Sequence, residues 1–220
     1  MVATFLLETE KLNDDAIFNK YYNQTSSYRK DKIDRYKFRK DKNLSLAVSI
    51  ILDYYLQGLN LKEADMHYST KPNGKPFFTN YEHLHFNASH SDNVAICSFS
   101  DSEIGCDVQS LYKGQQDIAK RFFTAKEYDY ICNEKKDSNE NLTSDEKFTR
   151  IWAIKEAYLK LNGAGLSEGL SSFNVSIDKN SVKINDNNSV NIKEYRFKDY
   201  FIAVCCNQSI ISDELIILSL

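Results

Sequence analysis

The sequence has little of several features that would direct its interpretation. Only two prolines and seven glycines occur among 220 residues, and the formal net charge of −3 gives no argument that the whole protein binds nucleic acid. No apolar run approaches the roughly 18 residues of a membrane-spanning helix. The N-terminus also lacks the basic region of a signal peptide. These absences predict a cytoplasmic protein that binds neither nucleic acid nor membrane.

The five cysteines do not form a recognisable framework. Their number is odd, no Cys-x-x-Cys pair occurs, and four of the five lie among apolar residues, as buried thiols do. The pattern argues against a disulfide scaffold and against a zinc site. A reducing compartment fits this cysteine usage best.

The residues that are present favour an α+β fold of two similar halves, residues 1–107 and 108–220. Two segments, 44–59 and 148–161, are apolar on most faces, which is typical of buried helices. Further helices are expected at residues 28–42, 114–121 and 125–132, and residues 134–146 read as a polar loop. Strands are expected at residues 2–7, 85–89, 94–99, 103–108, 173–177, 181–184, 201–206 and 213–220. Each half would then combine strands with one long helix, and we expect a site between them.

Two basic features suggest an anionic ligand. Residues 29–42 hold eight basic side chains and three acidic ones, a local excess that indicates either an anion site or a solvated helix face. Both prolines lie in the turn Lys71-Pro72-Asn73-Gly74-Lys75-Pro76. Lys75 on this rigid turn either reaches a phosphate or marks an ordinary surface turn.

The stretch Asn87-Ala88-Ser89-His90-Ser91 raises the question of a hydrolase site. Neighbouring residues of a strand point to opposite faces, so Ser89 and His90 are badly placed to act as nucleophile and base. A Gly-x-Ser-x-Gly elbow is also missing. Hydroxyls and an imidazole at a strand end can instead bind phosphate oxygens, while a plain polar turn remains the alternative.

Two acidic positions suggest a metal. On an extended strand, Asp107 and Gln109 face one side and Cys106 the other, so two oxygen ligands of the kind that magnesium prefers share a face. An acid on an edge strand is the simpler explanation. In the helix 148–161, Glu156 and Lys160 are four residues apart and share a face. This spacing is typical either of a surface ion pair or of a buried acid that needs a cation.

The helix carries more than this pair. Trp152 lies one turn before Glu156 on the same face, and Lys155 lies at the edge of that face. Each motif is weak by itself, but the motifs follow one another in a telling order. The series is Gly74-Lys75-Pro76, Asn87-x-Ser89-His90-Ser91, Ile104-Gly105-x-Asp107, Trp152-x-x-Lys155-Glu156-Ala157-x-x-Lys160 and Gly163-x-Gly165-Leu166-Ser167.

This series resembles the 4′-phosphopantetheinyl transferases, in particular the monomeric type typified by the surfactin-synthetase activator. The resemblance is clearest over residues 73–174. It implies two α+β halves related by a pseudo-twofold axis, each with a small antiparallel sheet and a long buried helix. It also implies an enzyme that transfers the 4′-phosphopantetheine arm of coenzyme A to a serine of an apo acyl or peptidyl carrier protein and releases adenosine 3′,5′-bisphosphate.

The resemblance assigns roles to particular residues. Asp107, Glu156 and Gln109 would hold magnesium, and Asp107, Glu156 and Lys160 would be catalytic, with Glu156 as general base and Lys160 beside the leaving group. Contacts to coenzyme A would come from Lys75, Pro76, Ser89, His90, Lys155, Lys32 and Arg29.

Two positions depart from the family pattern. Members of the family often have an acid at the position of Gln109, so we expect this protein to bind the metal more weakly. Members of the family usually have an arginine near the position of Leu44, and Lys40 or Lys42 would have to take its place here. A non-catalytic relative that only binds coenzyme A or a carrier is therefore the alternative. Carrier contact is expected around residues 111–123, which include Lys113 and Arg121; the sequence does not say which carrier is served.

Overall fold

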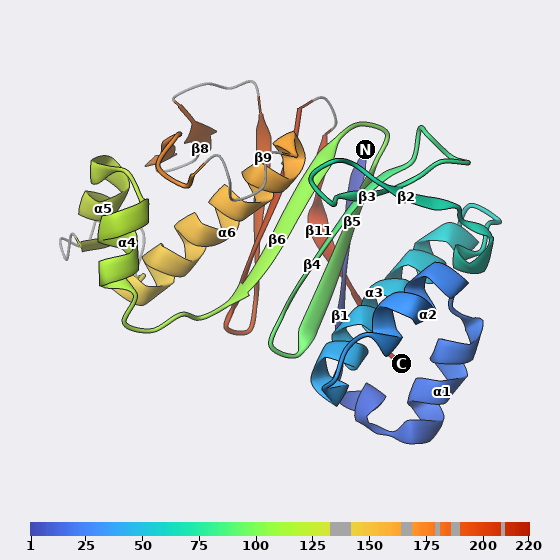
Figure 1. The fold of residues 1–220 in the computed structure, drawn as a ribbon. Coiled ribbons are helices and arrows are strands. Elements are labelled where there is room, and N and C mark those ends of the chain that lie inside the picture. Colours follow the sequence, from blue (N-terminus) through green and yellow to red (C-terminus); the bar gives the residue numbers. More distant parts are fainter. Residues whose placement is uncertain (133–141, 164–168, 179–180, 186–189, 208–209) are drawn as a thin grey trace.

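The structure is a computed structural model that describes residues 1–132, 142–163, 169–178, 181–185, 190–207 and 210–220. The chain is a mixed α+β protein in which helices cover two central sheets and two small hairpins lie to the side (Figure 1). Over these residues no helix is both long and apolar enough to cross a membrane.

The first sheet has the order β11-β1-β5-β4. Its strands are β1 (Val2–Glu8), β4 (His85–Ser91), β5 (Val94–Ser100) and β11 (Ile211–Leu218). β5 is antiparallel to both β1 and β4, whereas β11 is parallel to β1. The expectation of an antiparallel sheet is therefore wrong here, because the last strand of the chain returns to the sheet of the N-terminal half and runs along its first strand.

The second sheet is antiparallel and has the order β6-β10-β9. It comprises β6 (Ile104–Ser110), β9 (Asn191–Phe197) and β10 (Tyr200–Cys206). The predicted join after Asp107 falls inside β6, and β9 was not expected from the sequence. The small hairpins are β2 (Tyr68–Thr70) with β3 (Pro76–Phe78) and β7 (Val175–Asp178) with β8 (Ser181–Ile184).

Two long helices pack on these sheets. α3 (Arg39–Gln57) covers the face of β1 and β5, and α6 (Ser144–Asn162) covers β6 and β10 (Figure 1). The other helices are α1 (Asp15–Gln24), α2 (Ser27–Asp34), α4 (Gln116–Phe122) and α5 (Ala125–Cys132), with short 3-10 turns at Glu10–Asn13 and Glu63–Asp65. The single helix expected over residues 28–42 is wrong: α2 ends before α3 begins, and α2 packs against α3.

Local capping fixes the ends of α6. The Thr143 hydroxyl accepts a hydrogen bond from the Glu146 backbone N–H, and the Glu146 carboxylate accepts one from the Thr143 N–H, which is a capping box. Gly163 ends the helix in the left-handed conformation, with φ of 72°. α6 thus starts inside the segment expected to be a loop. The rest of that loop up to residue 141, and Gly165, lie outside the described residues.

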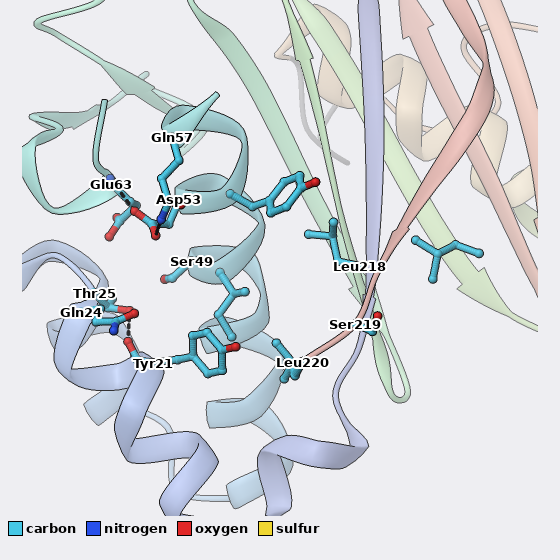
Figure 2. A pocket seen from close by; sticks show the side chains of 13 residues that line it. Tyr21, Gln24, Thr25, Ser49, Asp53, Gln57, Glu63, Leu218, Ser219 and Leu220 are labelled. Carbon is cyan, nitrogen blue, oxygen red and sulfur yellow. Dashed lines mark hydrogen bonds between the residues drawn. The ribbon is translucent and has the colours of Figure 1, made fainter. Parts of the chain in front are cut away.

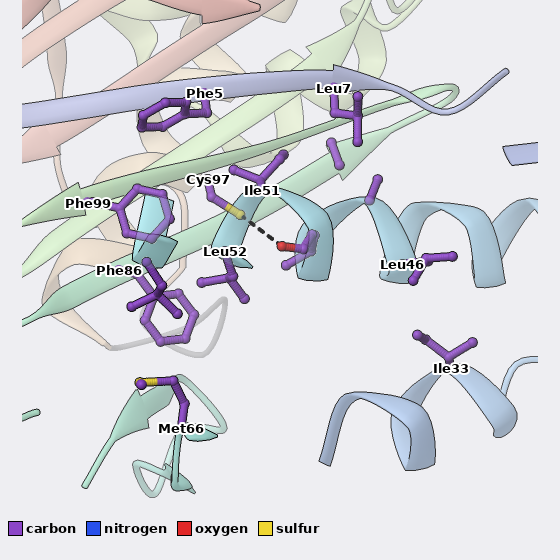
Figure 3. Packing of buried hydrophobic residues seen from close by; sticks show 14 of the residues in the cluster. Phe5, Leu7, Ile33, Leu46, Ile51, Leu52, Met66, Phe86, Cys97 and Phe99 are labelled. Carbon is purple, nitrogen blue, oxygen red and sulfur yellow. Dashed lines mark hydrogen bonds between the residues drawn. The ribbon is translucent and has the colours of Figure 1, made fainter. Parts of the chain in front are cut away.

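Three clusters of buried apolar side chains hold the layers together. The first joins α3 to its sheet through residues such as Leu46 and Ile51 of α3 and Phe99 of β5 (Figure 3). The second surrounds α6. The third includes Leu6 of β1 and Val108 of β6, so it joins the inner faces of the two sheets. Burial on both sides explains the nearly continuous apolar runs of these central strands.

β4 and β6 meet through side chains along a seam between the two sheets. The Asn87 amide oxygen accepts a hydrogen bond from the Cys106 backbone N–H at 2.9 Å. Four residues further along each strand, the Ser91 hydroxyl oxygen accepts a hydrogen bond from the Ser110 backbone N–H at 3.0 Å. Polar side chains at alternate positions of β4 thus take the place of a backbone ladder, which explains the polar Asn-x-Ser-x-Ser pattern in an otherwise apolar region.

Candidate functional site

A cavity of about 440 Å³ opens beside this seam, between α2 and α3 on one side and β6 and α6 on the other. Its wall draws on six elements, namely α2, α3, β3, β4, β6 and α6. The lining residues are Arg29, Lys32, Tyr36, Ser45, Val48, Pro76, Phe86, Asn87, Ala88, Ser89, His90, Asp107, Gln109, Tyr112, Trp152, Glu156 and Lys160. Most of the site residues expected from the sequence are therefore brought together in one place.

Gly105 sets the distance between β6 and α6. A Cβ atom at this position would lie 2.0 Å from the carbonyl oxygen of Ala157 and 2.4 Å from the backbone nitrogen of Leu161. Only a residue without a side chain lets the helix backbone come this close to the strand. The close approach brings Glu156 and Lys160 of α6 to the cavity wall that also carries Asp107 of β6.

Asp107 is the centre of a compact polar network. The residue is 1% exposed, and its Oδ1 accepts hydrogen bonds from the Ser89 hydroxyl at 2.7 Å and from Lys160 Nζ at 2.5 Å. Lys160 Nζ also donates to Ser89 Oγ at 2.9 Å, and the Gln109 side-chain amide donates to Asp107 Oδ2 at 2.7 Å. Burial is the largest single effect and would lower the pKa of Lys160, but the opposing effects, of which the charge of Asp107 is the largest, together raise that pKa, so the lysine stays cationic.

Glu156 is the second acid of the cavity and has no recorded hydrogen bond or ion pair among the described residues. Burial raises its pKa, the negative charge of Asp107 raises it further, and Lys160 only partly offsets these effects. Two carboxylates from different elements thus repel each other across one cavity, and Lys160 is ion-paired with Asp107. Such a pair would be relieved by a cation between them.

His90 and the basic residues of α2 carry the remaining polar wall. His90 is exposed, but partial loss of hydration beside the cavity lowers its pKa, and the positive charges of Lys160 and Lys32 lower it further, which favours the neutral ring. Lys32 is exposed overall, but partial loss of hydration and the charge of the neighbouring Arg29 lower its pKa. Arg29 itself is 4% exposed. The basic segment therefore sends two cations to the cavity and is not merely a solvated face.

Lys75 does not line the cavity, although Pro76 beside it does. Its ammonium donates to the Glu103 carboxylate at 2.9 Å and to the backbone oxygens of Ile104 and Lys160 at 2.7 and 3.0 Å. These bonds tie the 71–76 turn to the start of β6 and the end of α6. The ammonium expected to contact a ligand is thus engaged by the protein.

Lys155 also lies elsewhere than expected. Its side chain is fully buried and forms an ion pair of 2.7 Å with the equally buried Glu127 of α5. Its ammonium also donates to the carbonyl oxygens of Leu170 and Phe173. Burial lowers its pKa and the Glu127 charge partly restores it. Lys155 faces the α5 side of α6, away from the cavity, because adjacent helix residues are about 100° apart.

Other residues of the site follow or extend the sequence interpretation. Trp152, Glu156 and Lys160 share the cavity face of α6, as their spacing predicted. Cys106 points away from Asp107 and is buried, and burial raises its pKa to about 11, which fits an inert thiol. Tyr36 and Ser45 also line the cavity, and nothing in the sequence marked either as a site residue.

A second cavity, of about 410 Å³, lies on another side of α3 and is acidic (Figure 2). Glu63 is fully buried there and accepts hydrogen bonds from the Ser26 N–H and hydroxyl at 2.7 Å each. Asp53 accepts one from the Glu63 N–H at 3.1 Å. Glu63 thus binds Ser26, the N-cap residue of α2, so this acid stabilises the start of that helix. No group of three or more histidine, cysteine or acidic side chains placed to hold a metal occurs in the described part of the chain.

Asp107 and Glu156, the Lys160 ammonium that is bonded to Asp107, and the basic side chains of Arg29 and Lys32 line one cavity, and these groups suit a phosphate-bearing ligand. Comparison with known proteins names the class. Residues 103–205 match the model of the 4′-phosphopantetheinyl transferase superfamily. The chain belongs to this superfamily and is an enzyme, a 4′-phosphopantetheinyl transferase similar to the surfactin-type members.

Individual relatives cover most of the chain. It is 31% identical to the 4′-phosphopantetheinyl transferase Sfp of Bacillus subtilis, over 82% of this chain and 81% of that protein. It is 30% identical to the 4′-phosphopantetheinyl transferase gsp of Aneurinibacillus migulanus, over 94% of this chain and 86% of the relative. It is 28% identical to the 4′-phosphopantetheinyl transferase ffp of Bacillus subtilis, over 88% and 87%.

Proposed function

We propose that the protein transfers the 4′-phosphopantetheine arm of coenzyme A to a serine of an apo acyl or peptidyl carrier protein and releases adenosine 3′,5′-bisphosphate. The observation that carries this proposal is the meeting of Asp107 and Glu156 in one cavity, with Lys160 bonded to Asp107 and a basic end formed by Arg29 and Lys32. A long, narrow ligand with phosphates at both its middle and one end matches this distribution of charge.

Magnesium fits the donor set of the cavity. Asp107 and Glu156 offer carboxylate oxygens and Gln109 offers an amide oxygen, which are the ligand types of a hard cation. Burial, and after it the negative charge of Asp107, raise the pKa of Glu156, and a bound cation would oppose both effects. When bound, the ion would neutralise pyrophosphate charge during transfer.

Glu156 and Lys160 have different roles in the transfer reaction. The carrier serine attacks the β-phosphorus of coenzyme A, and the bond from that phosphorus to the bridging oxygen of the pyrophosphate breaks. Glu156 accepts the serine proton, directly or through a water, because its carboxylate has no recorded partner among the described residues and its raised pKa makes it a better base than an exposed acid. Lys160 stays protonated and stabilises the departing bisphosphate.

The outer parts of coenzyme A bind along the rest of the cavity. Arg29 and Lys32 hold the 3′-phosphate, Ser89 and His90 contact the phosphates near the seam, and Pro76 borders the adenosine end. Lys75 contributes by fixing the turn that carries Pro76. Lys155 has the same kind of indirect role, since it secures α6 from the side opposite the cavity.

We also propose that the chain has two halves, residues 1–107 and 108–220, that are related by a pseudo-twofold axis, with the cavity between them. Each half pairs a central sheet with a 19-residue helix, α3 or α6. β11 is the exception, because it crosses back to the first sheet. Both halves are present in one chain, so the enzyme acts as a monomer.

The carrier docks beside α4. Tyr112 lines the cavity and is 38% exposed, and α4 presents Ile118 and Phe122, which are 36% and 41% exposed, next to Arg121. Exposed apolar side chains with a cation among them suit a protein surface that is partly acidic. Charge reversal at Lys113 or Arg121 should therefore raise the carrier KM; an unchanged KM would argue against this surface.

The proposed function is tested by incubating the protein with coenzyme A, magnesium and several apo carrier proteins, and measuring the carrier mass. A mass increase of one phosphopantetheine group supports it. If no carrier gains mass although coenzyme A binds, the protein is a non-catalytic relative and the proposal is wrong.

A further inference from the structure

The two central sheets meet at β4 and β6, and in the described part of the chain these strands share no backbone ladder. β4 is an edge strand of the first sheet and β6 is an edge strand of the second, and the two lie side by side (Figure 1). Neighbouring strands of one sheet are aligned by a regular series of backbone hydrogen bonds. The alignment of β6 along β4 depends instead on side chains, so the loss of one side chain can change it.

Two side chains of β4 bind the backbone of β6. The Asn87 amide oxygen accepts a hydrogen bond from the Cys106 N–H, and the Ser91 hydroxyl oxygen accepts one from the Ser110 N–H. The Cys106 thiol also donates to the Asn87 carbonyl oxygen at 3.1 Å. In both pairs the partners are 19 residues apart in the sequence, so both bonds specify the same alignment of the two strands.

This alignment decides where the Asp107 carboxylate lies. Asp107 directly follows Cys106 in β6. Its Oδ1 accepts hydrogen bonds from the Ser89 hydroxyl of β4 and from Lys160 Nζ of α6. Residues of a strand are about 3.3 Å apart along its axis, so a slip of one residue would carry the carboxylate roughly that far from Ser89 and toward the other face. The bond between Asn87 and Cys106 is therefore made next to the acid whose position matters most.

We propose that Asn87 is a positioning residue of the transfer reaction, which holds β6 at the register where the Asp107 carboxylate meets Ser89 and Lys160. Its amide oxygen acts on the backbone of Cys106 and needs no contact with a substrate. Cys106 is fully buried, so removal of the Asn87 oxygen leaves a buried N–H unpaired, which is unfavourable. β6 then shifts to relieve this loss and takes Asp107 with it. This inference rests on the proposed function.

The test compares kcat with stability in three variants, at temperatures where all of them are folded. Asn87→Ala should lower kcat for transfer about 100-fold and change the KM for coenzyme A little, because a shift of about 1 Å at a reacting centre can cause such a loss. Asn87→Ser should restore most of this rate, since Ser91 shows that a serine hydroxyl of β4 can accept a β6 N–H at this register. Asn43→Ala removes another buried amide, bonded to Arg39 and Asn13 outside the cavity, and should lower Tm comparably while kcat keeps its wild-type value.

Hydrogen exchange gives a second readout that does not depend on transfer. The Cys106 amide proton should exchange faster in Asn87→Ala than in the wild type or in Asn43→Ala, because it has lost its acceptor. Asn87→Ser should restore the protection of this proton.

A wild-type kcat in Asn87→Ala would overturn the inference. So would losses of kcat in Asn87→Ala and Asn43→Ala that follow the loss of Tm alike, because the effect would then be one of stability alone. A rate of Asn87→Ser as low as that of Asn87→Ala would also overturn it, since the reaction would then need the amide itself. If the wild-type protein modified no carrier, the proposed function would fail, while exchange at Cys106 would still decide whether Asn87 fixes β6.

Discussion

Replacing Gly105 with alanine tests whether the close contact of β6 and α6 builds the site. The new Cβ would lie 2.0 Å from the Ala157 carbonyl oxygen, and separations below 3.0 Å are essentially never seen, so this distance must grow to at least 3.0 Å. The obstructing atoms belong to the helix backbone and cannot rotate away. Overpacking of this kind typically costs about 1–3 kcal/mol of stability.

The same displacement separates Asp107 from Glu156 and Lys160, and a shift of about 1 Å at a reacting centre can lower a rate about 100-fold. We therefore expect Gly105→Ala to lose about 1–3 kcal/mol in urea unfolding and to retain about 1% of the wild-type transfer rate at temperatures where it is folded. Gly58→Ala is the control, because Gly58 has φ of −62°, which alanine adopts, and its nearest neighbour would be 3.2 Å away. Wild-type stability and activity in Gly105→Ala would refute the reasoning.

Three further predictions concern single side chains. Gln109→Glu adds a charge beside Asp107 and should lower the magnesium concentration that gives half-maximal rate; an unchanged requirement would place Gln109 away from the metal. Lys155→Ala leaves Glu127 buried and unpaired and should lower the free energy of unfolding by about 3–5 kcal/mol without raising the KM for coenzyme A, whereas a raised KM at native stability would contradict its position. The pKa of Glu156 is raised in the folded protein, so the ionised carboxylate destabilises the fold at pH 7. Glu156→Gln should therefore raise Tm at pH 7. This gain in Tm should shrink as the pH falls through the raised pKa of Glu156 toward 4.5.

The elements that the sequence predicted are those whose signal is local. The core helix at 148–161 is apolar on most faces and is closed by Gly163, and it appears in the structure with one additional turn at its start. The break between α2 and α3 has no proline or glycine to announce it; it depends on α2 packing against α3, which is a tertiary effect. The pairing of β11 with β1 joins the two ends of the chain, and no local pattern encodes such a contact.

The site divides in the same way. Strand alternation predicted that Asp107 and Gln109 share a face, and helix spacing predicted the same for Glu156 and Lys160. The direction of Lys155 was not predicted, because the choice between the cavity and the α5 side depends on Glu127, which comes from another helix. The seam role of the Asn87 side chain was equally hidden, because its partner lies 19 residues away on a neighbouring strand.

The central claim, that Glu156 performs the chemistry of transfer, is tested most directly by the time course of carrier mass. The wild-type protein, Glu156→Gln and Glu82→Gln, which changes an exposed acid outside the cavity, are each mixed with coenzyme A, magnesium and an apo carrier. The carrier should gain one phosphopantetheine group at equal rates with the wild type and Glu82→Gln, and at least about 100 times more slowly with Glu156→Gln. Equal rates for all three proteins would contradict the role assigned to Glu156.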